Sequence, residues 1–181
     1  MSDDFAAVLT HAADAARAYG AHALEAARAR FLCGDRVDAT RLHDDQRALH
    51  GFAWLTTTVA AIASASAAGV ALQRAGRLMA HDRHLLQIGL AEYLLQLAGG
   101  IPMGQNEIFR PDELGLRGHA AALRAHAGVQ ALIEQGGAAS TRKALIDACR
   151  AGAPRAEAGL DDELDMSREQ FRRFTAQEIT P

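Results

Sequence analysis

Hydrophobic positions along the chain recur at three- and four-residue steps over long stretches, which is the period of an amphipathic α-helix. The first stretch predicts a helix over residues 3–32, ended by Gly34 and Asp35. Its apolar stripe consists of Phe5, Val8, Leu9, Ala12, Ala16, Tyr19, Ala23, Ala27 and Phe31. We expect this stripe to face a helical core.

Four more helices are predicted over residues 40–75, 78–98, 119–135 and 141–150. Glycines follow three of them, and Ser140 is suited to cap the last. The helix over 40–75 is predicted to turn inward Leu42, Leu49, Phe52, Leu55, Val59 and Ile62. The helix over 78–98 carries Leu85, Ile88, Leu94 and Leu95 and meets two glycines and a proline, Gly99, Gly100 and Pro102.

Residues 103–118 have no sustained period, and they predict an irregular connection with a short turn around residues 112–114. So long a connection needs packing of its own, for which Ile108, Phe109, Leu114 and Leu116 are available. A polar cluster in it comprises Glu107, Arg110, Asp112 and Glu113. We interpret the cluster as a solvated or helix-capping set, with a site that contacts a substrate or partner as the alternative.

The chain divides into a helical bundle over 1–151, a linker over 152–166 rich in glycine and alanine, and a last helix over 167–181. Ser167 to Gln170 has the S-x-x-Q form of a capping box. Phe171 and Phe174 follow with nothing after them to pack against, so we expect the natural chain to continue.

With 41 alanines and only nine aromatic residues, the composition favours helices over strands. The predicted fold is all-α: an antiparallel bundle, a linker and one further helix.

Charge and cysteine content exclude several classes of protein. Lys and Arg total 19 against 22 Asp and Glu, and the formal net charge is -3, so no nucleic-acid-binding surface is expected. The two cysteines, Cys33 and Cys149, form no C-x-x-C pair, which suits a reducing compartment. The acidic start lacks the order of a signal peptide, so we expect a cytoplasmic protein.

No charged residue occurs from Gly51 to Gln73, a length that could span a bilayer. The stretch holds several Thr, Ser and Ala residues, so we interpret it as the central helix of the bundle, buried on most faces, and expect no membrane partner. Trp54, with Phe52 and Tyr93, is interpreted as core filling between alanine-rich helices rather than as an aromatic binding site.

Several runs of sequence are similar to a known family. Residues 167–181 read SREQFRRFTAQEITP, and earlier runs read HGFAWL at 50–55, EYLLQLAGGIPM at 92–103 and DELGL at 112–116. The last helix resembles the opening helix of acyl-CoA dehydrogenases. The earlier runs resemble the helical segment that precedes the dehydrogenase body in the methylsuccinyl-CoA branch of that family. The resemblance implies FAD and an acyl-CoA substrate in the full-length protein, with the flavin-binding β-domain and the catalytic base further along the chain.

Candidate site residues are few, and no catalytic residue is assigned. Gln96, Gly99 and Gly100 form a Q-x-x-G-G string similar to a family segment that meets the flavin diphosphate, although a helix C-cap explains the glycines equally directly and is the interpretation we favour. His81 and His84 share a helix face and could hold a metal if a third ligand converged. Neither a cofactor nor a metal is expected in this chain.

The leading hypothesis is a non-catalytic helical domain at the N-terminus of a dehydrogenase. It would bind the remainder of that chain and shape substrate access or the assembly of a homo-oligomer. The alternative is a stand-alone helical interaction or assembly module with no enzymatic role.

Overall fold

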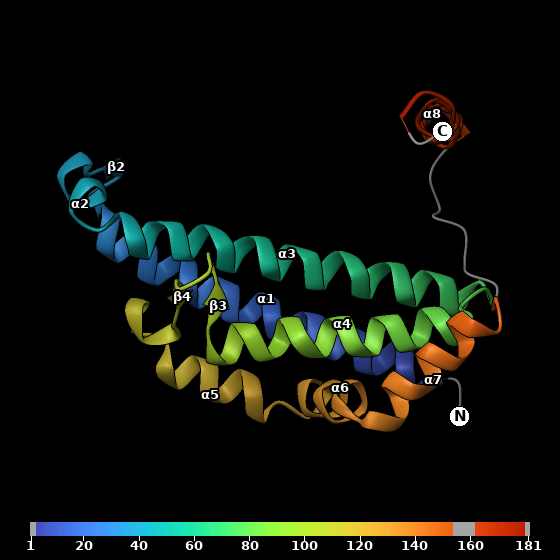
Figure 1. Ribbon diagram of the computed structural model, residues 1–181. Helices are drawn as coiled ribbons and strands as arrows, with labels where there is room; N and C mark the ends of the chain where they lie inside the picture. Colours follow the sequence, from blue (N-terminus) through green and yellow to red (C-terminus); the bar gives the residue numbers. More distant parts are fainter. Residues whose placement is uncertain (1–2, 154–161, 180–181) are drawn as a thin grey trace.

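A computed structural model describes residues 3–153 and 162–179 (Figure 1). The α-helices are α1 Asp3–Phe31, α2 Ala39–Asp44, α3 Gln46–Arg74, α4 Ala80–Gly99, α5 Arg117–Ala125, α6 Ala127–Gly137, α7 Ala139–Arg150 and α8 Asp162–Phe174. A 3-10 helix, Pro111–Leu114, precedes α5, and a π-helical turn, Thr175–Ile179, follows α8. In the described ranges the strands form two short antiparallel hairpins, β1 Leu32–Cys33 with β2 Arg36–Val37 and β3 Ile101–Pro102 with β4 Ile108–Phe109. The predicted all-α class is confirmed.

The long helices α1, α3 and α4 lie side by side, and successive ones run in opposite directions (Figure 1). The shorter helices α5, α6 and α7 follow along the flank of α4, where α6 also packs against α1. The predicted apolar stripe of α1 is confirmed, because all its members are buried except Val8, which is partly buried. The stripe consists largely of alanine, which allows the neighbouring helices to approach closely.

The helix predicted over 40–75 is two helices, because Asp45 leaves the helical conformation with φ -134° and ψ 45°. Its carboxylate forms an ion pair with Arg30, near the end of α1. Asp38 caps α2 by accepting hydrogen bonds from the backbone N–H groups of Thr40 and Arg41. The predicted single helix was therefore wrong, and the residue at the break contacts another helix, which a local pattern does not reveal.

The helix predicted over 119–135 is also divided, at His126, whose backbone is extended with φ -66° and ψ 129°. After the break, α6 packs against α1 in a direction different from that of α5. Gly128 lies so close to α1 that a Cβ built on it would be 3.0 Å from the Cβ of His11. No proline or glycine marks the break, so the local sequence did not reveal it.

Helices α7 and α8 begin earlier than predicted. Helix α7 begins at Ala139 with no side-chain cap, so the expected cap at Ser140 is wrong; the Thr141 hydroxyl donates instead to the carbonyl of Gln135 at 2.6 Å. Helix α8 begins at Asp162, which places the S-x-x-Q run inside the helix rather than at its start. Most of the glycine- and alanine-rich linker, residues 154–161, and the final Pro181 lie outside the described residues. The division into 1–151, 152–166 and 167–181 stays a prediction.

Helix α3 is buried on one face, not on most faces as predicted. The buried residues recur at helical spacing and are Ala48, Gly51, Leu55, Thr58, Ile62, Ser66 and Gly69. The opposite face includes Trp54, which is 40% exposed, and Tyr93 of α4 is 43% exposed. The interpretation of these two aromatics as core was therefore wrong, while Phe52 is partly buried against the core.

Of the apolar residues that the sequence analysis named in helix α4, Leu94 is buried and Leu85 is exposed. Leu90, Leu94 and Leu97 are buried, whereas Leu85 is 47% exposed. Short helices cover the buried side, and the exposed side borders α3. The face was ambiguous in the sequence because leucine occurs all round this helix.

The long connection after α4 is packed down by its own side chains, as expected, and contains the hairpin that the sequence analysis missed. Phe109, Leu114 and Leu116 are buried, although Ile108 is 39% exposed. The Phe109 ring lies against α3 at Gly51, where a Cβ would be only 2.0 Å from a ring carbon. This contact requires glycine and fixes the hairpin against α3 near its N-terminal end.

Candidate functional site

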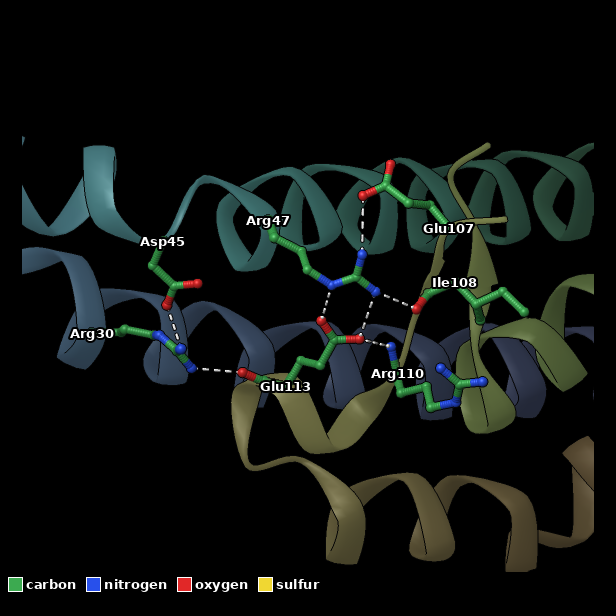
Figure 2. Close-up of polar contacts among 7 residues, drawn as sticks. All are labelled: Arg30, Asp45, Arg47, Glu107, Ile108, Arg110 and Glu113. Atoms are coloured by element: carbon green, nitrogen blue, oxygen red, sulfur yellow. Dashed lines mark hydrogen bonds and ion pairs between the residues drawn. The ribbon is translucent and has the colours of Figure 1, made fainter. Parts of the chain in front are cut away.

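The most connected polar cluster joins the first turn of α3 to the long connection (Figure 2). Arg47 Nε donates to Glu113 Oε2 at 2.7 Å, and Arg47 Nη1 donates to Glu107 Oε1 at 3.0 Å. Arg47 Nη2 donates to the carbonyl oxygen of Ile108 at 2.8 Å. One guanidinium thus binds both ends of the segment that contains β4 and the 3-10 helix.

Glu113 is the carboxylate at the centre of this cluster. It accepts a hydrogen bond from the backbone N–H of Arg110 at 2.9 Å, which caps the 3-10 helix. Partial burial opposes its charged form, yet the hydrogen bonds from Arg47 and from the Arg110 backbone hold the pKa of the Glu113 carboxyl below its usual range. The hydrogen bond to Glu113 also raises the pKa of Arg47. The helix-capping interpretation is confirmed for Glu113.

Two further arginines extend the cluster. Arg30 pairs with Asp45 and donates from Nη1 to the carbonyl oxygen of Glu113 at 2.6 Å, which ties α1 to the same turn (Figure 2). Arg117 donates to both oxygens of Asp112, at 2.7 and 2.8 Å, and these bonds lower the pKa of Asp112. Sequence reasoning found the four members between residues 107 and 113 but missed Arg30 and Arg47, because nothing in the local sequence links them to the connection.

The Gln96–Gly100 string ends α4. The backbone N–H of Gly100 donates to the carbonyl of Gln96 at 2.8 Å, so it is already engaged. Gly100 has φ 148°, and a Cβ there would lie 2.7 Å from Ile108 Cγ2. These contacts account for Gly100 as the C-cap of α4 that turns the chain into β3, and the flavin role of Gln96, Gly99 and Gly100 stays a prediction.

His81 and His84 lie in the first turns of α4 but have different neighbours. His81 is buried, and its Nδ1 lies 3.9 Å from Cys149 Sγ of α7. His84 Nδ1 lies 3.2 Å from Gln87 Oε1, and Gln87 in turn donates to Gln135 of α6. In the described residues no group of three or more His, Cys, Asp or Glu side chains could hold a metal ion.

The remaining histidines form one pair that the sequence analysis missed. The rings of His22 on α1 and His119 on α5 are stacked, with centroids 3.8 Å apart. His126 lines a small hollow between these helices together with His22 and His119. His50 accepts a hydrogen bond from the indole N–H of Trp54 at 2.9 Å.

An apolar groove of about 310 Å³ runs between α3 and α4. Leu72, Leu85, Gly89 and Tyr93 are among its lining residues, and Asp82 is its charged member. Helix α3 carries no charge from Gly51 to Gln73, so the α3 side of the groove is uncharged. Helix α3 is also long and apolar enough to cross a membrane by length and composition, which core helices of soluble proteins can be too.

No family model matches the chain, but a curated protein is similar to it. A curated relative from Cereibacter sphaeroides is 34% identical over 163 residues, which is 88% of this chain. That relative is a (2S)-methylsuccinyl-CoA dehydrogenase. The chain spans only 29% of the length of this dehydrogenase. The resemblance drawn from the sequence is confirmed as similarity to part of an acyl-CoA dehydrogenase.

Proposed function

We propose that the chain is the N-terminal, non-catalytic helical domain of an FAD-dependent acyl-CoA dehydrogenase of the methylsuccinyl-CoA type. The observation that carries the proposal is the match itself, which takes in 88% of this chain but 29% of the dehydrogenase. In this proposal FAD, the acyl-CoA substrate and the base that removes the substrate proton belong to the remainder of a cytoplasmic, homo-oligomeric enzyme. The domain restricts access of substrate or orders the oligomer.

The polar cluster supports a structural role for the described residues. Each carboxylate of Glu107, Asp112 and Glu113 has an arginine partner. A general base needs a proton to abstract within hydrogen-bonding reach and a pKa near the working pH. The arginine partners lower the pKa values of Asp112 and Glu113, away from the neutral pH at which a general base would work. We therefore assign these groups to fastening the connection.

The apolar groove between α3 and α4 is the surface through which we propose that the domain binds the rest of its own chain. More than two thirds of the matched dehydrogenase lies outside the segment that this chain matches. Large exposed apolar patches usually mark interaction sites, and two residues that line this groove, Leu85 and Tyr93, are each more than 40% exposed. Packing of these side chains against the rest of the dehydrogenase chain would remove their apolar surface from water and so stabilise the contact.

The proposal is tested with a chimera in which this chain replaces the matching segment of the Cereibacter sphaeroides enzyme. We expect the chimera to bind flavin and oxidise (2S)-methylsuccinyl-CoA. Gly89→Leu places a side chain in the groove, where a Cβ on Gly89 meets no atom within 4 Å. This variant should change substrate preference or oligomeric state but not flavin content. Gly118→Leu, also in open space but on α5, is the matched control and should change neither.

Two results would overturn the proposal. A chimera from which residues 1–151 are deleted, but which keeps the substrate preference and oligomeric state of the intact chimera, would favour the stand-alone interaction module. A stoichiometric flavin spectrum from the isolated chain would make Gly99 and Gly100 a cofactor site. We expect the isolated chain to be colourless.

A further inference from the structure

A second hollow, of about 240 Å³, lies where the end of α4, the 3-10 helix and α5 meet. Its lining residues include three arginines, Arg110, Arg117 and Arg124, and one acidic residue, Asp112. Between them the lining is small and apolar, with Gly99 and the methyl groups of Ala98, Ala120 and Ala121. The hollow is separate from the apolar groove between α3 and α4.

Charge in this hollow is unbalanced. The Asp112 carboxylate accepts two hydrogen bonds from Arg117, which neutralises its charge locally. Over residues 3–153 and 162–179, no carboxylate forms an ion pair with Arg110 or Arg124. Figure 2 shows the Arg110 guanidinium turned away from the Glu113 carboxylate, which accepts from the Arg110 backbone instead. The lining therefore has three arginines against one carboxylate, and Arg110 also interacts electrostatically with Glu113, which lies beside the hollow.

The sequence of α5 places two of these arginines on one side of the helix. Arg117, Ala120, Ala121 and Arg124 stand at positions i, i+3, i+4 and i+7 and so share one helix face. The two arginines are about 10 Å apart along the axis, with small alanines between them. The C-terminal end of α4 and the N-terminal end of α5 both border the hollow, and their partial charges oppose each other. The helix ends therefore add little net charge to that of the arginines.

We propose that this hollow binds a phosphate group, either as free phosphate or as the terminal monoester of a larger molecule. A phosphate monoester carries about -1.5 to -2 charges near neutral pH, which matches the surplus. Guanidinium groups bind phosphate oxygens through paired hydrogen bonds, which makes arginine the preferred partner. Pockets that enclose a whole cofactor measure roughly 300–1,000 Å³, so this smaller hollow suits the phosphate and leaves the rest of a ligand outside.

Titration of the intact 181-residue chain tests the proposal. Binding of inorganic phosphate, of adenosine monophosphate and of adenosine is followed by calorimetry at constant ionic strength. We expect saturable binding of both phosphates and none of adenosine. Tighter binding of the nucleotide would identify a phosphate ester as the source, and equal binding would identify free phosphate.

Variants locate the binding. Arg124→Gln and Arg110→Gln should each weaken phosphate binding at least tenfold, whereas Arg36→Gln, an exposed arginine in β2, should not. Circular dichroism checks that the variants keep the helical content and melting temperature of the parent chain. Equal weakening by Arg36→Gln, or no saturable binding of either phosphate, would overturn the proposal. Binding of an acidic peptide without phosphate would also overturn it and make the hollow a protein interface. None of these outcomes bears on the proposed dehydrogenase role.

Discussion

Tyr19 lies in a core built mainly from alanine and leucine, and its hydroxyl is buried with the ring. In the part of the chain that the structure describes, this hydroxyl has no hydrogen-bond partner. Burial raises the pKa of Tyr19 to about 12. A raised pKa stabilises the fold while the phenol is neutral, so this contribution is present below pH 10 and is lost as the pH rises toward 12.

Trp54 and Phe109 differ in exposure, so their alanine variants test how exposure of an aromatic side chain affects the loss in free energy of unfolding. Trp54→Ala is expected to lower the free energy of unfolding by about 1–2 kcal/mol, because 40% of the residue already meets water. Phe109→Ala should cost about 3–5 kcal/mol, the usual value for a buried aromatic. Phe109 is only 1% exposed. Urea denaturation measures both, and the reverse order would mean that the indole is covered in solution.

At the scale of elements, close approach of helices depends on small residues. Gly136 of α6 lies against α4, where a Cβ would be 2.1 Å from the backbone oxygen of Gln87 and 2.5 Å from the Cβ of Ala91. Backbone atoms of a long helix cannot yield as a flexible side chain can. The spacing of α4 and α6 is therefore set by this glycine.

Gly136→Ala should destabilise the bundle by about 1–3 kcal/mol, the typical cost of overpacking. Gly137→Ala is the matched control, since a Cβ at the next position meets no atom within 4 Å. Its effect should stay within about 0.5 kcal/mol. Thermal unfolding of the two variants beside the parent protein gives the comparison, and equal effects would contradict the observed packing of α6 on α4.

The element that connects α4 to α5 should be sensitive to acid. Glu113→Gln is expected to cost about 1 kcal/mol at neutral pH, because it removes a charged partner of Arg47. The folded protein holds the pKa of Glu113 low, so its stabilising effect is present above the ordinary value of 4.5 and is lost as the pH falls below it. The difference between parent and variant, measured by urea unfolding, should shrink between about pH 7 and pH 3. A difference that does not change with pH would contradict this account.

For the molecule as a whole, the distribution of charge separates two kinds of surface. The face shared by α3 and α4 is apolar or uncharged over most of its length, while the connection and α5 concentrate arginines and their carboxylate partners. In the two proposals made above, the first surface would bind the rest of a dehydrogenase chain and the second would hold a phosphate group.

This arrangement makes a prediction for fractionation. Expressed alone, the chain should remain in solution after the membranes are sedimented, because one face of α3 packs in the bundle and the other carries only scattered large apolar side chains. Recovery of the chain only with detergent-solubilised membranes would mean that α3 spans or enters a bilayer. A variant with Ala60→Lys on the exposed face of α3 separates the two cases, since it should leave a bundle soluble but disfavour membrane insertion.

Local sequence pattern was enough to predict the helical class, the inward stripe of α1 and the end of α4 at two glycines. These features depend on helical period and on backbone freedom, which act within a few residues. It also located the acidic and basic residues of the connection, and its runs of sequence pointed to the family. Only the tertiary structure decided that Arg47 and Arg30 bind this connection, that the chain breaks at Asp45 and His126, and that Trp54 lies at the surface. Each depends on contacts between residues distant in sequence, which a local pattern of polar and apolar positions does not encode.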